Sequence, residues 1–178
     1  MKSVLVFVST LDGKVTKWGN PVVKKWASAS DQKYFIELWN SSKLIIMGSN
    51  TYNADPPKPS PKHLLVVITR SPLLYKKYEV KGQLEFLSDS PSEIFTRFEN
   101  EGHEQMIVVG GAHIATSFLR EQLIDEIWLT IEPKIFGTGG CFVIDEMLDI
   151  DLRLISCEKV NEQGTLITKY RVVKNTIG

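Results

Sequence analysis

The chain has 178 residues, of which 43% are hydrophobic and 24% are charged, with 12 glycines and 8 prolines. This composition is globular, and it excludes a collagen-like, disulfide-stapled or largely disordered chain. Lysine plus arginine equals aspartate plus glutamate at 21 each, so no basic excess indicates nucleic acid or an anionic membrane as a partner. The length predicts a single domain over residues 1–178.

The cysteines and the N-terminal segment indicate the cellular compartment and whether a metal site is expected. Cys141 and Cys157 lack the spacing of a metal-binding motif, so we expect no structural zinc or iron–sulfur site. The first apolar run, residues 4–8, is too short for the core of a signal peptide or for a membrane span. These features predict a cytoplasmic protein with free thiols and no metal.

Short apolar runs, each bounded by polar or turn residues, predict strands buried on both faces of a sheet. In chain order, these strands and the helices between them are strand 4–8, helix 30–41, strand 44–47, strand 64–69, a helix that begins with the capping box Ser90-Pro91-Ser92-Glu93, strand 106–109, helix 113–120 and strand 127–131. Residues 153–160 and 165–173 flank a turn that ends in Gly164, which predicts a β-hairpin. This order of elements predicts an α/β sheet with mixed strand directions.

Three predicted strands end in small, hydroxyl or basic residues. These ends are Gly48-Ser49-Asn50-Thr51, Thr69-Arg70-Ser71 and Gly110-Gly111, the last of which leads into a helix. Glycine lets a ligand approach the backbone, and both arginine and a helix N-terminus attract phosphate. Because open α/β sheets bind ligands at the carboxyl ends of their strands, these residues predict an extended nucleotide groove. Taken alone, Gly110-Gly111 fits a tight structural turn equally well.

Asp31 stands between Trp26 and Phe35, at the start of the helix predicted over residues 30–41. Ser28 and Asp31 have the spacing of a capping pair, and a carboxylate in the first turn favours the helix dipole. Alternatively, a carboxyl between aromatic residues in a cleft has a raised pKa, and it can donate a proton to a nitrogen heterocycle or anchor it. The sequence leaves both interpretations open.

Four motifs follow one another over nearly the whole chain. They are Ser9-Thr10-Leu11-Asp12-Gly13-Lys14-Val15, Met47-Gly48-x-x-Thr51-Tyr52, Gly110-Gly111-Ala112-x-Ile114, and a last one from Leu123 through Asp125-Glu126, Thr130 and Pro133 to Gly137. Together they resemble the dihydrofolate reductase superfamily, in particular small reductases similar to the reductase domain of the riboflavin-biosynthesis deaminase-reductase. The resemblance implies a dihydrofolate reductase-like three-layer α/β/α fold with a mostly parallel central sheet and an antiparallel C-terminal hairpin.

The same resemblance implies an NAD(P)H-dependent oxidoreductase, with NADPH expected and NADH left open. Carried over position by position, the cofactor contacts are Gly48, Ser49, Asn50, Thr51, Thr69, Arg70, Ser71, Gly110, Gly111, Ala112, His113 and Ile114, with a cis Gly110–Gly111 bond. Asp12 falls in the loop over the nicotinamide, and Trp26 and Phe35 match substrate-binding positions. Asp31 matches the catalytic acid and Thr130 the threonine that hydrogen-bonds it.

Two positions depart from these families. Ser49 stands where folate reductases usually have the arginine that binds the 2′-phosphate of NADPH, a role left to Arg70. Val109 stands where the riboflavin-pathway reductase usually has glutamate. The main prediction is hydride transfer to a C=N bond of a pterin-like heterocycle. The alternatives are reduction of a pyrimidine, as in the riboflavin pathway, or of another non-folate substrate, and a non-catalytic NAD(P)H-binding module.

The expected partner is therefore a small heterocyclic molecule, with no nucleic acid and no membrane. The resemblance also indicates a homodimer, because small relatives of this kind often pair.

Overall fold

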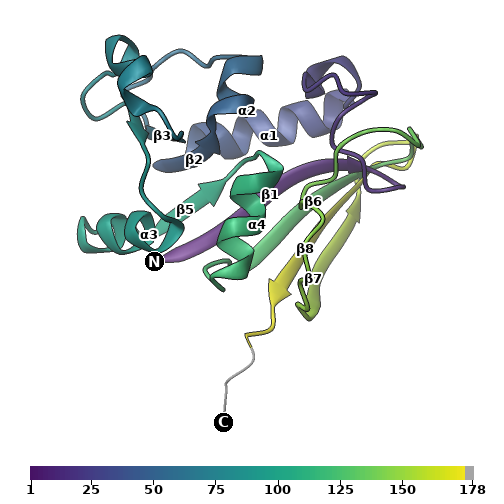
Figure 1. The fold of residues 1–178 in the computed structure, drawn as a ribbon. Helices are drawn as coiled ribbons and strands as arrows, with labels where there is room; N and C mark the ends of the chain where they lie inside the picture. Colours follow the sequence, from purple (N-terminus) through teal and green to yellow (C-terminus); the bar gives the residue numbers. More distant parts are fainter. Residues whose placement is uncertain (175–178) are drawn as a thin grey trace.

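The computed structural model describes residues 1–174 and contains one eight-stranded sheet with helices on both faces (Figure 1). The strands are β1 (Lys2–Thr10), β2 (Leu44–Gly48), β3 (Leu64–Ile68), β4 (Leu84–Leu87), β5 (Gln105–Val108), β6 (Glu126–Glu132), β7 (Leu152–Lys159) and β8 (Leu166–Val172). Their order across the sheet is β4-β3-β2-β5-β1-β6-β8-β7. Strands β1 to β6 pair in parallel, whereas β8 pairs antiparallel with both β6 and β7. The predicted mostly parallel sheet and antiparallel C-terminal hairpin are confirmed.

The helices are α1 (Ala29–Ser41), α2 (Ser49–Ala54), α3 (Pro91–Asn100) and α4 (Ala112–Arg120), with 3₁₀ segments η1 (Val23–Lys25) and η2 (Pro72–Tyr78). The predicted capping box begins α3: the Glu93 amide donates to Ser90 Oγ, and the Ser90 amide donates to Glu93 Oε2 at 2.8 Å. These reciprocal bonds satisfy backbone donors that the first turn of a helix leaves unpaired.

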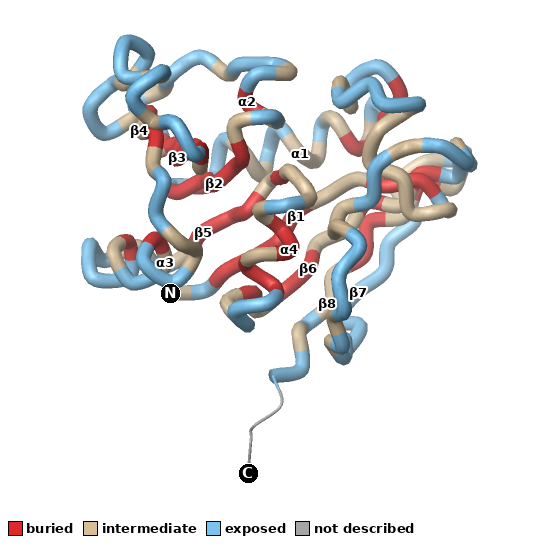
Figure 2. Tube along the Cα trace, viewed as in Figure 1, coloured by how far each residue is buried: buried red, intermediate tan, exposed pale blue. Residues whose placement is uncertain are grey.

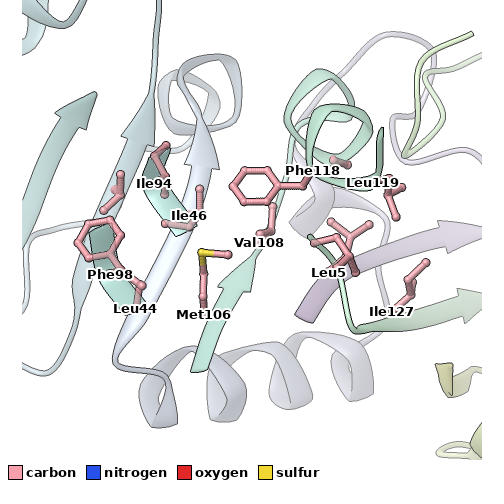
Figure 3. Packing of buried hydrophobic residues seen from close by; sticks show 13 residues of the cluster. Leu5, Leu44, Ile46, Ile94, Phe98, Met106, Val108, Phe118, Leu119 and Ile127 are labelled. Carbon is pink, nitrogen blue, oxygen red and sulfur yellow. The ribbon is translucent and has the colours of Figure 1, made fainter. Parts of the chain in front are cut away.

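Alternate residues of the central strands face two separate cores, one on each side of the sheet. On one side Ile46 and Val108 pack with Phe98 of α3 and Phe118 of α4 (Figure 3). On the other side Ile45 and its neighbours pack against the aromatic side chains of α1. Because helices cover both faces, β2 and β5 are buried along almost their whole length (Figure 2), which explains their continuous apolar sequences. The three-layer α/β/α arrangement is confirmed.

Two elements were not predicted. β4 has the short sequence Leu84-Glu85-Phe86-Leu87, in which buried and half-buried side chains alternate, and it lies at one edge of the sheet. Helix α2 begins directly at Ser49, within residues that the sequence predicted only as a strand end. Both elements are too short to show a periodicity of their own.

Strand β7 forms the opposite edge of the sheet, and all eight of its residues are exposed (Figure 2). They include three aliphatic side chains, Leu152, Leu154 and Ile155, with exposed fractions of 43%, 54% and 44%. An edge strand with aliphatic side chains on its surface is suited to pairing with another strand.

Three further observations concern residues 1–174. Both cysteines are free, as predicted, and both are exposed. None of the helices in this range is both long enough and apolar enough to span a bilayer. No three His, Cys, Asp or Glu side chains in this range are arranged to bind a metal ion.

Candidate functional site

A cleft of about 1210 Å³ opens at the carboxyl ends of the parallel strands. Its position follows from the strand order, because β5 is formed late in the chain but is inserted between β1 and β2. The chain leaves β1 for α1 on one face of the sheet and leaves β5 for α4 on the other, as the two cores show. Such a switch point leaves a crevice at the strand ends, where α/β proteins bind ligands. The cleft exceeds the usual volume of a pocket for one small ligand.

Two glycine-containing strand ends form the floor of the cleft. The Gly110–Gly111 bond is cis, and the Gly48 amide donates to the Gly110 carbonyl oxygen at 2.8 Å. A Cβ atom at Gly111 would lie 3.2 Å from Thr51 Oγ1, and one at Gly48 would lie 2.9 Å from Ile114 Cγ1. Glycine at these two positions therefore allows close packing against Thr51 and Ile114, and both segments line the cleft. The tight turn is present, and its glycines line the cleft.

The predicted cofactor residues all line this cleft except Ser71. The Ser71 amide donates to Thr69 Oγ1 at 3.3 Å, and the residue lies just beyond the lining at the start of η2. Ser88, which follows β4, lines the same end as Thr69 and Arg70. Ser88 was missed because β4 itself was not recognised.

Asp31 and Thr130 meet at the other end of the cleft, from α1 and β6 respectively. Asp31 is 6% exposed and Thr130 is 1% exposed, and the threonine hydroxyl donates to the Asp31 carboxyl. The Asp31 amide donates to Ser28 Oγ at 3.2 Å, so the predicted helix cap is also confirmed. Phe35, one turn further along α1, lines the cleft as predicted. One short segment thus both caps the helix and presents a carboxyl to the cleft.

Burial raises the pKa of Asp31 to about 6, the hydrogen bond from Thr130 opposes the increase, and the negative charge of Glu132 adds to it. Tyr34 lies on the same face of α1, and burial together with the Asp31 charge raises its pKa to about 12. The Tyr34 hydroxyl is buried without a partner among the described residues and borders the cleft. This end of the cleft can therefore donate protons near neutral pH.

Two residues predicted to bind substrate, Trp26 and Asp12, do not line the cleft. The Trp26 ring is 6% exposed and packs edge-on against Phe136, with ring centroids 5.2 Å apart. The Asp12 carboxylate accepts hydrogen bonds from the Thr10 hydroxyl and from the Gly137 amide, the latter at 2.7 Å. These bonds lower the pKa of Asp12 and use its oxygens to join two loops. A substrate contact for either residue finds no support in its position.

The structure adds residues that the sequence did not single out. Val15 and Thr16, just beyond Asp12, line the cleft in its place. Lys24 Nζ and Asp55 Oδ2 form an ion pair of 2.5 Å between two segments of the cleft wall. Glu132, at the end of β6, is 1% exposed and acts on Asp31 through its charge. Val15 ends the first motif and Glu132 falls within the last, but neither was a candidate site residue, and the other residues belong to no recognisable pattern.

A model of the RibD C-terminal domain matches residues 2–166 of the chain. The protein is a member of the RibD C-terminal domain family. The match spans the sheet from β1 to the start of β8 and so includes the whole cleft.

Two uncharacterized proteins of Bacillus subtilis (strain 168) are similar to this chain in sequence. YwjB is 25% identical over 144 residues, which cover 78% of this chain and 80% of YwjB. YyaP is 23% identical over 163 residues, which cover 86% of each chain.

Solved structures share the RibD-like fold. A pyrimidine reductase-like protein from Corynebacterium diphtheriae has a TM-score of 0.77 at 15% identity, with 98% of this chain and 92% of that chain covered. A putative riboflavin biosynthesis protein from a Shewanella species has a TM-score of 0.74 at 19% identity, with coverage of 98% and 100%. A deaminase/5-amino-6-(5-phosphoribosylamino)uracil reductase from Thermotoga maritima has the same TM-score at 18% identity, and the match covers 97% of this chain but 56% of that chain.

The buried acid predicts a pH-dependent change in stability. The folded-state pKa of Asp31 lies near 6, above its ordinary value of 3.8, so the wild-type protein loses stability as pH rises through 6. Asp31→Asn removes this cost, so we expect its free energy of unfolding near pH 8 to exceed that of the wild type by about 2–3 kcal/mol. Below about pH 4 the acid is neutral in both states, and this advantage disappears.

Urea denaturation across this pH range measures the difference. The exposed Asp145→Asn is the matched control and should show no pH-dependent gain. An equal gain in both variants would contradict the prediction.

Proposed function

We propose that this protein is an NADPH-dependent reductase that transfers hydride to a C=N bond of a heterocycle containing a pyrimidine-type ring. The observation that carries the proposal is a buried carboxyl with a pKa near 6, at one end of a cleft whose other end has glycine backbone and an arginine. The names of two solved neighbours describe pyrimidine reductases, which favours the pyrimidine alternative over a pterin. A pterin shares the pyrimidine ring, so it is the natural comparison substrate.

The glycine end of the cleft suits a dinucleotide. Gly48 and Gly111 line the cleft and carry no side chain, so a pyrophosphate could approach their backbone closely. Arg70 would bind an adenosine phosphate beside Thr69 and Ser88, a task for which the guanidinium group is suited. When bound, NADPH supplies the hydride.

The carboxyl end suits a flat nitrogen heterocycle. Phe35 offers a ring face, and Asp31 can accept hydrogen bonds from ring N–H groups or donate its proton. Hydride addition to the carbon of a C=N bond leaves an electron pair on the nitrogen, which takes a proton from Asp31. Thr130 orients the Asp31 carboxyl through its hydrogen bond. Water returns the proton to Asp31 after product release.

Asp31→Asn is expected to lower kcat by about 10²–10⁴-fold, because an amide cannot supply the proton. Affinity for NADPH should be unchanged, since Asp31 lies at the opposite end of the cleft. The measurement is NADPH oxidation at 340 nm with dihydrofolate and a panel of aminopyrimidines, together with NADPH binding by fluorescence. NADPH binding without oxidation by any heterocycle would instead favour the non-catalytic binding module.

Arg70→Gln is expected to weaken NADPH binding about tenfold and to leave NADH binding unchanged, because only NADPH has the 2′-phosphate that a guanidinium binds. Titration calorimetry with both nucleotides measures the two dissociation constants. Lys62→Gln, also exposed but outside the cleft lining, is the control. Equal losses for NADPH and NADH would show that Arg70 does not bind that phosphate.

We also propose that the protein forms a homodimer through β7. The strand is fully exposed and carries three exposed aliphatic side chains. The β-bulge between Leu154 and Ser156 puts Arg153 and Glu158 on the same face of β7. Antiparallel pairing of two copies centred on Ser156 then places Arg153 opposite Glu158 of the second copy. A two-fold interface repeats that contact, so it contains two opposite-charge pairs.

A charge exchange tests this interface. Arg153→Glu alone should place like charges opposite each other and lower the dimer fraction in light scattering. The double variant with Glu158→Arg should restore the dimer, because the pairs are rebuilt with reversed sign. A dimer unaffected by the single variant would exclude this register.

A further inference from the structure

Glu132 is a buried acid that the proposed reaction does not use directly. It ends β6, is 1% exposed, and both of its carboxylate oxygens accept hydrogen bonds. Oε1 accepts from the Ser28 amide at 2.7 Å, and Oε2 accepts from Thr165 Oγ1 at 2.8 Å. Among the ion pairs of residues 1–174, none includes Glu132. Burying a carboxylate without a cation lowers the stability of the folded protein, so we expect Glu132 to have a role beyond packing.

Through these bonds Glu132 connects three separate parts of the chain. Ser28 caps α1, and its Oγ also accepts from the Asp31 amide. Thr165 is fully buried in the β7–β8 turn, where Asn161 Oδ1 accepts from the Thr165 amide at 3.0 Å. Glu132 therefore fixes the start of α1 against the end of β6 and against the hairpin turn.

This connection sets the geometry between Asp31 and Thr130. Asp31 belongs to α1 and Thr130 to β6, the two elements that Glu132 ties together. Thr130 and Glu132 are two residues apart on one strand, so both side chains lie on the same face of the sheet. A loosened α1 terminus would move Asp31 away from the threonine that orients it.

The charge of Glu132 acts on Asp31 in the same place. Burial is the larger cause of the raised pKa of Asp31, and the negative charge of Glu132 adds to it. Of the other titratable groups facing this end of the cleft, Tyr34 on α1 stays neutral because its pKa is raised to about 12. Lys24, from η1, is held by Asp55. The described structure thus gives Asp31 a nearby anion and no free cation.

We propose that Glu132 is a positioning residue of the reductase site, which holds Asp31 in register with Thr130. This inference rests on the proposed function, in which Asp31 is the proton donor. It also explains why a costly buried anion is placed beside an acid that must donate a proton.

Two variants separate charge from geometry. Glu132→Gln removes the charge, keeps the length of the side chain, and leaves a carbonyl oxygen to accept from the Ser28 amide. Thr165→Val keeps the charge but removes the hydroxyl that ties Glu132 to the hairpin turn. Glu126→Gln is the matched control, because Glu126 is a buried carboxylate at the far end of the same strand.

The first measurement is a carbon-13 NMR titration of the Asp31 carboxyl, which requires no substrate and is assigned with Asp31→Asn. In Glu132→Gln we expect the apparent pKa of Asp31 to fall by about one unit, because the like charge is gone. In Glu126→Gln, the Asp31 carboxyl should titrate with the same apparent pKa as in the wild type. An unshifted Asp31 titration in Glu132→Gln would overturn the inference.

The second measurement is the pH profile of NADPH oxidation, with a heterocycle that the wild type reduces. Since a lower pKa deprotonates Asp31 earlier, the alkaline fall in kcat of Glu132→Gln should move to lower pH by about one unit. Thr165→Val should lower kcat several-fold without moving that fall to lower pH. A kcat unchanged in Thr165→Val would overturn the positioning role.

The two proposals fail in distinguishable ways. Near-normal turnover in Asp31→Asn would overturn the proposed function and this inference with it. A large loss in Asp31→Asn, together with an unmoved pH profile in Glu132→Gln, would overturn this inference alone.

Discussion

The insertion of β5 between β1 and β2 is the constraint on which the rest of the molecule depends. It is fixed by backbone hydrogen bonds at the strand ends, from the Val109 amide to the Ile46 carbonyl oxygen at 2.9 Å and from the Gly48 amide to the Gly110 carbonyl oxygen at 2.8 Å. Because a chain segment must leave β1 on one face of the sheet and β5 on the other, a crevice remains between them. Glycines at the two strand ends allow them to pack closely against Thr51 and Ile114 beside that crevice.

The two ends of the cleft differ in the sign of their charge and in their exposure to solvent. At the glycine end, the exposed Arg70 and the backbone amides provide a positive potential. Solvent screens the charge of Arg70, so this charge costs little stability. At the carboxyl end, Asp31 and Glu132 are buried together, and their mutual repulsion is tolerated because hydrogen bonds satisfy the Glu132 oxygens. Stability is reduced locally, as is common where a group must hold a proton outside its ordinary range.

The parts of the fold that the sequence predicted well are those with a strong repeating pattern. The inner strands appear as continuous apolar runs because both of their faces are covered, and the capping box marks the start of α3. β4 was missed since a four-residue edge strand is too short to establish a pattern. Spacing along α1 placed Asp31 and Phe35 correctly because both lie on one helix face.

Errors in the site arose where local spacing says nothing about which neighbour covers a side chain. Trp26 precedes α1 at the expected distance, but Phe136, more than 100 positions later, packs against it. Asp12 lies in a matched motif, yet loop amides such as that of Gly137 donate hydrogen bonds to its carboxylate. In the sequence, Glu132 follows an apolar run and resembles an ordinary polar residue at the end of a strand.

By itself, the sequence determined the mainly parallel sheet, the glycine-containing strand ends and the helix that carries Asp31, because each depends on contacts within a short stretch of chain. Only the tertiary structure decided which side chains face the cleft and why the pKa of Asp31 is raised. Burial and the field of Glu132 come from elements far apart in sequence, and hydrogen bonds from Ser28 and Thr165 bring them together. Such long-range contacts leave no local periodicity by which they could be recognised.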